Sequence, residues 1–115
     1  MAYRVVVAAR ARADIGEAYS WILDLAPDGA AAWLDGLEAC IASLSNNPRR
    51  CARAREDDYF EPHIRQLVFG RGRRAFRVFF TVEARVVYVL HVRRASREGF
   101  EEEVLRAIER GDFET

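Results

Sequence analysis

Arginine supplies most of the side chains that could do chemistry in this sequence. Residues 49–97 hold thirteen arginines against five acidic residues, whereas residues 1–48 and 98–115 are each net acidic, so the formal net charge of the chain is zero. The chain contains no lysine. A guanidinium binds phosphates and carboxylates through paired hydrogen bonds and stacks on flat bases. The basic middle segment therefore predicts a surface for nucleic acid or an acidic protein, or else simply a solvated arginine-rich surface.

Histidine offers one further candidate. His91 lies in the apolar run Val87–Val92, and an imidazole can transfer protons near neutral pH. A histidine flanked by Leu90 and Val92 is also typical of simple sheet packing. Cys40 and Cys51 do not have the spacing of a metal motif, and we expect two free thiols without a functional role. No cofactor and no metal is predicted.

The elements that must position these groups follow from the apolar pattern. Apolar residues recur at helical spacing from residue 11 until Pro27 ends the helix. We expect Asp14 to lie away from the apolar face of this helix. Asp28 is a plausible N-cap for a second helix that ends at Asn46–Pro48. The predicted strands are 3–7, 64–69, 75–82 and 86–92, residues 93–97 leave the sheet, and residues 97–115 form a short acidic helix and tail.

This order predicts an α+β domain of two layers: strand, helix, helix, three antiparallel strands and a C-terminal helix. A length of 115 residues suits one domain, spanning residues 1–115. Strict alternation places Arg77 and Phe79 on one face of the second late strand, and Tyr88 and His91 on opposite faces of the third. No apolar run is long enough to cross a membrane and no signal peptide is evident, so we expect a cytoplasmic protein.

Three stretches of the sequence resemble the RelE/ParE family of toxins, often described as plasmid stabilisation proteins. They are the second helix and its exit (Ala31–Leu37 through Pro48–Arg50), the strand entry Ile64–Leu67, and the strand Phe76–Val82 followed by Val87–Arg94. The order of elements agrees as well, over about residues 3–97. The resemblance implies the toxin of a type II toxin–antitoxin system, which arrests growth unless its antitoxin is bound.

The resemblance leaves the target of the toxin open. ParE-like members poison DNA gyrase and are not enzymes in the usual sense, whereas RelE-like members are endoribonucleases that cleave messenger RNA on the ribosome. We expect the ParE-like activity. The alternatives are the ribosome-dependent nuclease and a non-toxic remnant that only binds its antitoxin. In each case the antitoxin is expected to wrap a segment along the helices or the sheet edge.

The same resemblance suggests site residues. Arg77 aligns with an arginine that RelE-type nucleases place against the scissile phosphate, and a nuclease would use Arg77, Arg65 and His91. Candidate contacts to nucleic acid or another target are Arg65, Arg77, Arg93, Arg94 and Arg97. Arg77 could equally form a structural ion pair with Glu83 or with an acid of the first helix.

Two departures from the nuclease pattern count against an enzyme. The strand that usually carries several basic residues holds Gln66, Leu67 and Val68 and supplies only Arg65. Phe100 stands near the position of a catalytic tyrosine and has no ionisable hydroxyl. A nuclease would therefore have to cleave with arginine and histidine alone.

Overall fold

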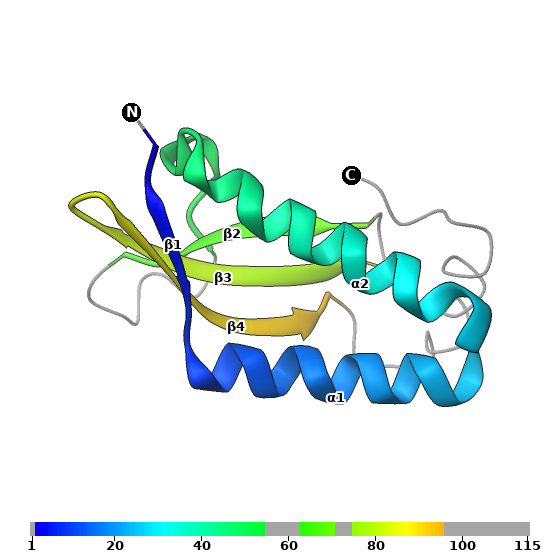
Figure 1. The fold of residues 1–115 in the computed structure, drawn as a ribbon. Coiled ribbons are helices and arrows are strands. Elements are labelled where there is room, and N and C mark those ends of the chain that lie inside the picture. The colour runs from blue at the N-terminus through cyan, green and yellow to red at the C-terminus, as the bar shows by residue number, and fades with distance from the viewer. Residues whose placement is uncertain (1, 55–62, 71–74, 96–115) are drawn as a thin grey trace.

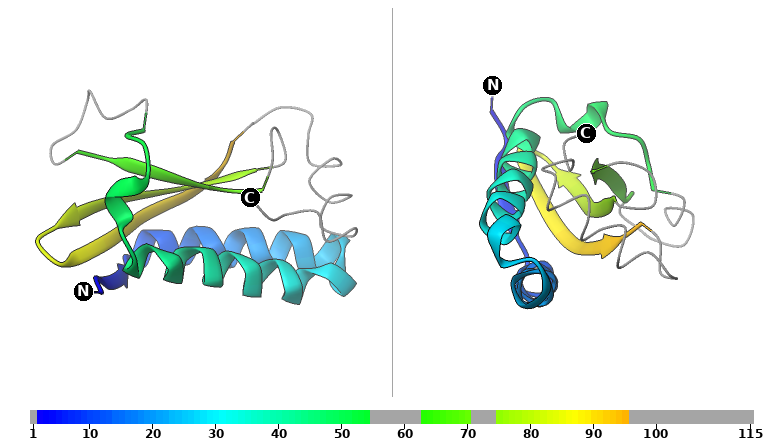
Figure 2. Two further views of the ribbon diagram at one scale, coloured as in Figure 1. Left: turned by 90° about the horizontal axis from the view of Figure 1, so that it is seen from above. Right: turned by 90° about the vertical axis from the view of Figure 1, so that its right-hand side faces the viewer.

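Two helices cover one face of a sheet in the computed structural model of the chain (Figure 1). The structure describes residues 2–54, 63–70 and 75–95. Within them the elements are β1 (Arg4–Val7), α1 (Ala9–Leu25), α2 (Pro27–Ala42), short 3-10 turns at Ser43–Ser45 and Pro48–Arg50, β2 (Arg65–Phe69), β3 (Phe76–Glu83) and β4 (Val86–Arg94). The turned views show both helices on the same side of the sheet (Figure 2). The α+β two-layer prediction is confirmed.

The strand order in the described part of the sheet is β1-β4-β3-β2. The three late strands are antiparallel neighbours, as predicted, and β1 pairs with β4 in parallel from Arg4↔Val86 to Val7↔Val89. The strand β4 therefore has a neighbouring strand on each edge. Because β1 stops at Val7, the last residues of β4 continue beyond it, and α1 begins at that point.

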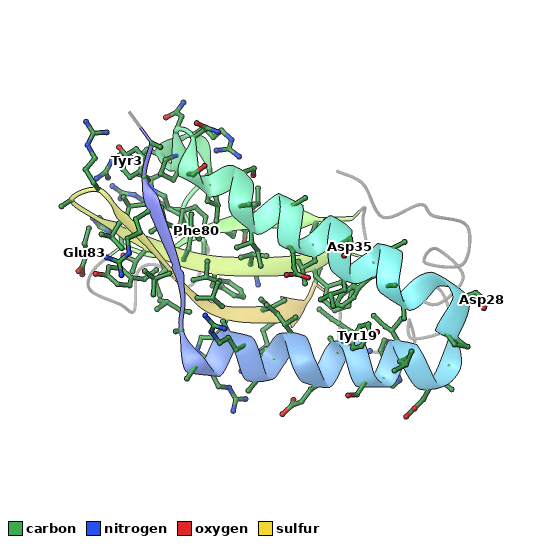
Figure 3. All side chains as sticks on the ribbon, viewed as in Figure 1. Tyr3, Tyr19, Asp28, Asp35, Phe80 and Glu83 are labelled. Atoms are coloured by element: carbon green, nitrogen blue, oxygen red, sulfur yellow. The ribbon has the colours of Figure 1, made fainter. Side chains whose placement is uncertain are left out.

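Only Ala26 separates the two helices, so α1 and α2 form a tight antiparallel hairpin. Pro27 is the first residue of α2, where its fixed φ suits a helix and its missing N–H has no cost. The expected N-cap at Asp28 was wrong: Asp28 lies inside the first turn, and no side chain caps this helix end. Asp28 is at the tip of the hairpin, where its negative charge interacts favourably with the positive end of the helix dipole (Figure 3).

Aromatic residues from the helices and the sheet fill the space between the layers. Trp33 of α2 is 1% exposed and packs edge-on against Phe76, with ring centroids 5.1 Å apart, and against Phe69 at 6.5 Å. Phe80 points from β3 into the same core and is fully buried (Figure 3). These contacts fix the helix-covered face of β3, so the odd-numbered residues of that strand must lie on the other face.

The predicted C-terminal helix, including Phe100 and Arg97, lies outside the described residues. Among the helices that the structure describes, none combines the length and the apolar character needed to cross a membrane.

Candidate target-binding site

The sheet face that the helices leave uncovered carries three of the predicted site residues, Arg77, His91 and Arg93. On β3 this face presents Arg77, Phe79 and Thr81, which alternate with the core residues Phe76, Val78 and Phe80. The register continues the face onto β4, because Arg77 pairs with Arg93 and Phe79 pairs with His91. Cross-strand partners share a face, so Arg77, His91 and Arg93 belong to one surface. We call this surface the outer face.

A bulge in β4 corrects one prediction about this face. Phe79 pairs with His91 while its neighbour Phe80 pairs with Val89, which leaves Leu90 as an extra residue. An extra residue reverses the alternation on one side of the bulge. Tyr88, the partner of Thr81, therefore lies on the outer face with His91, and the expectation that the two lie on opposite faces was wrong.

Arg77 is held inside the protein. It is 9% exposed, its Nε donates to Gln66 Oε1 at 2.9 Å, and a terminal nitrogen donates to the same oxygen. Its guanidinium also lies over the Phe79 ring, 4.4 Å from the centroid. Gln66 is the partner on β2 that the sequence did not suggest. The arrangement favours a structural role for Arg77 over a phosphate contact.

Arg65 does not join Arg77. It pairs with Phe80 and so lies on the helix-covered face of β2. Its guanidinium donates to the carbonyl oxygens of Cys51, at 2.7 Å, and Arg49, at 3.3 Å, which ties β2 to the turn after α2. A single phosphate therefore cannot lie against both Arg65 and Arg77, and the predicted nuclease set is not assembled.

Arg93 and Arg94 belong to β4, and the expectation that the chain leaves the sheet at Arg93 was wrong. Arg94 pairs with Phe76 on the helix-covered face and lies over the Trp21 ring, 5.4 Å from the centroid. The side chain of Arg93 lies on the outer face and is 44% exposed. Among the predicted site arginines that the structure describes, Arg93 therefore best combines exposure with a fixed position.

Asp14 of α1 holds this end of β4, and its sequence assignment to the polar side of the helix was wrong. Its side chain is 1% exposed. Oδ2 accepts a hydrogen bond from the backbone N–H of Val92 at 3.0 Å. Oδ1 accepts a hydrogen bond from a terminal nitrogen of Arg93 at 2.8 Å and lies 3.3 Å from Arg10 Nε. His91 Nδ1 lies 3.4 Å from both Asp14 Oδ2 and a terminal nitrogen of Arg93.

The sequence did contain a signal for Asp14. Asp14 follows the buried Ala11 by three residues and precedes Ala18, which packs against the core, by four. These steps place Asp14 on the apolar stripe of the helix, where a carboxylate needs partners.

A cleft of about 400 Å³ opens beside Asp14, between α1 and the end of β4. It is lined by Asp14, Glu17, Ala18, Trp21, Phe76, Val92, Arg93 and Arg94. Its lining combines four apolar residues with four charged residues, two of each sign. Among the described residues no group of histidine, cysteine and carboxylate side chains could hold a metal ion. Burial raises the pKa of the free thiols Cys40 and Cys51, which makes them poor nucleophiles.

Comparison with known proteins agrees with this architecture. A solved structure titled "Chromosomal ParDE TA system from P. aeruginosa" matches with a TM-score of 0.67 and 20% sequence identity, over 82% of this chain and 97% of that chain. At that identity the match shows a shared fold. A search of curated proteins found no significant match.

A family model gives the assignment. The model of the ParE toxin of type II toxin–antitoxin systems (parDE) matches residues 5–99, which include every element described above except the first residue of β1. The chain therefore belongs to the family of ParE toxins of type II toxin–antitoxin systems.

Proposed function

We propose that the chain arrests growth by inhibiting DNA gyrase unless its antitoxin is bound. ParE toxins of type II systems pair with an antitoxin, and family membership supports that pairing here. The proposed site of action is the cytoplasm, where gyrase works. The proposed target contact is the exposed end of the outer face, centred on Arg93, because its guanidinium is both accessible and oriented.

The position of the arginines carries the choice of a protein target. Metal-free cleavage of RNA needs a base, an acid and cations grouped around one phosphate. Arg65 lies on the helix-covered face, while Arg77 lies on the outer face, buried and bonded to Gln66. His91 is left without either arginine as a free phosphate contact. This separation supports an inhibitor that binds a protein rather than a nuclease.

Controlled expression with three readouts tests the proposal. The chain is produced from a repressible promoter, with and without the product of the adjacent antitoxin gene, and growth, DNA damage response and messenger RNA integrity on ribosomes are followed. Purified chain is added to a gyrase supercoiling assay. We expect growth arrest, DNA damage and loss of supercoiling, all reversed by antitoxin.

The rival functions give different results. Rapid loss of translation with messages cut on ribosomes, and unaffected supercoiling, would establish the endoribonuclease instead. Tight binding of the antitoxin without any growth defect would establish the non-toxic remnant.

A matched variant, Arg85→Ala, changes an exposed arginine at the far turn between β3 and β4 and should keep full activity.

A further inference from the structure

We propose that Asp14 is a positioning residue that holds Arg93 in the orientation in which it contacts the target. This inference rests on the proposed function, because it assigns Arg93 to the toxin's target surface. Asp14 itself is almost completely buried and cannot reach a partner protein. It acts through Arg93.

The need for a carboxylate at this place comes from the ends of β1 and α1. The last link along the edge of β4 that faces β1 is the bond from Ala8 N–H to the Val89 carbonyl, at 2.9 Å. Beyond this bond, the N–H of Val92 has no acceptor on a neighbouring strand. A buried N–H without an acceptor reduces the stability of the folded state. One helical turn into α1, Asp14 Oδ2 accepts that N–H at 3.0 Å.

The two carboxylate oxygens bind different parts of the protein. Oδ2 accepts the backbone N–H of Val92, which fixes the carboxylate relative to the sheet, and it also lies 3.4 Å from His91 Nδ1. Oδ1 then accepts one terminal nitrogen of Arg93 at 2.8 Å, and the other terminal nitrogen lies 3.4 Å from His91 Nδ1. A guanidinium has five N–H donors in a rigid fork, so donors remain for a partner. An arginine oriented before binding loses less side-chain entropy when it binds.

Arg10 is a natural control for this idea. It contacts the same oxygen of Asp14 at 3.3 Å, but it lies one turn earlier on α1, and its side chain is 57% exposed. It forms an i,i+4 pair within one helix, and its own guanidinium stays largely in solvent, so it is not held against the sheet as Arg93 is. If the charge of Asp14 matters only for the local electrostatics of α1, Arg10 and Arg93 should be equivalent. If Asp14 positions Arg93, only Arg93 should matter for toxicity.

The test compares Asp14→Asn, Arg93→Ala, their double variant and Arg10→Ala in the full chain. Asparagine keeps an oxygen for the Val92 N–H but loses the charge that orients Arg93. We expect Asp14→Asn and Arg93→Ala each to lower toxicity at least about tenfold, as loss of a charged hydrogen bond does. The double variant should be no weaker than Arg93→Ala, and Arg10→Ala should be fully toxic. Antitoxin affinity and the thermal midpoint of each variant report whether it has folded.

Each contrary result has a distinct meaning. Full toxicity of Asp14→Asn, or a double variant whose loss is the product of the two single losses, would overturn the positioning role. Equal losses for Arg10→Ala and Arg93→Ala would overturn it as well. Growth arrest without inhibition of gyrase would overturn the proposed target and leave Asp14 to be judged by toxicity alone. A wild-type chain without toxicity would overturn both proposals.

Discussion

Arg77 and Arg93 are direct cross-strand partners in β3 and β4, yet their guanidinium groups turn away from each other. Arg77 reaches across to Gln66 of β2, and Arg93 reaches past the other edge of β4 to Asp14 of α1. Like charges directly opposite each other are unfavourable in a sheet. Here Gln66 and Asp14 bind the two guanidinium groups on opposite sides, so that Arg77 is buried and Arg93 stays at the surface. The pair thereby divides the outer face into a structural part and an accessible part.

Replacing Arg77 should therefore reduce stability before it affects function. In Arg77→Ala the partly buried amide oxygen of Gln66 loses two hydrogen bonds, and we expect a loss of about 2 kcal/mol in the free energy of unfolding. Toxicity and antitoxin binding should fall together. Denaturant unfolding measures the loss, with Arg85→Ala as an exposed control that loses only its contact with the Tyr3 ring and changes stability by less than about 1 kcal/mol. A normally stable Arg77→Ala protein with selectively lost toxicity would assign Arg77 to the target surface instead.

Gln66 provides the complementary measurement. Since Arg77 and Gln66 share one interaction, the losses caused by Gln66→Ala and Arg77→Ala should not add in the double variant. Strictly additive losses would show that Arg77 is held mainly by other contacts, such as the ring of Phe79.

The sequence predicted the layers of this fold because each element repeats a simple period. The spacing of Leu37, Ile41 and Leu44 marks the buried side of α2 and its exit, and the alternation of Phe76, Val78 and Phe80 marks that of β3. Periodicity does not contain strand order. The parallel position of β1 beside β4 depends on tertiary packing, which local patterns leave open.

The candidate site was harder to predict, and for two physical reasons. The bulge at Leu90 is a backbone irregularity, and nothing in the apolar run Val86–Val92 distinguishes it from regular alternation. The charge of Asp14 suggests the polar face of α1, whereas its spacing from Ala11 and Ala18 places it on the apolar face. A charged residue at a core position was the clue, because such a residue must have partners from elsewhere in the fold.

The turn between β3 and β4 contains a strained residue, and relieving the strain should stabilise the protein. Ala84 has φ 53°, a left-handed conformation that costs a non-glycine residue about 1 kcal/mol. Ala84→Gly should raise the free energy of unfolding by about 1 kcal/mol. Ala42→Gly is the matched control: Ala42 is exposed and helical, with φ −60°, so glycine there gains no relief of strain and should destabilise by about 1 kcal/mol. A loss of stability in Ala84→Gly would contradict the strain.

Thr81 offers a second stabilising change. It is 5% exposed on the outer face, and among the described residues its hydroxyl is a buried group without a hydrogen-bond partner. Thr81→Val has the same shape without the hydroxyl, so the free energy of unfolding should rise by about 1 kcal/mol. Thr81→Ser keeps the hydroxyl and loses the methyl group, and it should destabilise. If valine proved as harmful as serine, the hydroxyl would have a partner that matters.

The two thiols, Cys51 buried and Cys40 partly buried, should make stability fall at alkaline pH. Burial is the main cause that raises the pKa of Cys40 and Cys51, and the charge of Cys51 adds to the effect on Cys40. A thiol in the unfolded chain has a pKa of about 8.5. Below that pH both states keep the proton, and the thiols have no effect. Above it the unfolded state releases the proton first, so the free energy of unfolding decreases with rising pH until the raised folded pKa is passed.

Comparison with thiol-free variants isolates this effect from the other groups that titrate at high pH. Unfolding is measured between pH 7 and pH 10 for the wild type, Cys40→Ala and Cys51→Ala. The difference in stability between wild type and each variant should be constant up to about pH 8.5 and then change in favour of the variant. Alkylation of the folded wild type at pH 8 should also be slower than that of free cysteine, because little thiolate is present. A pH-independent difference together with rapid alkylation would mean that neither thiol is shielded, and that the contacts of α2 with the following turn are looser than the structure describes.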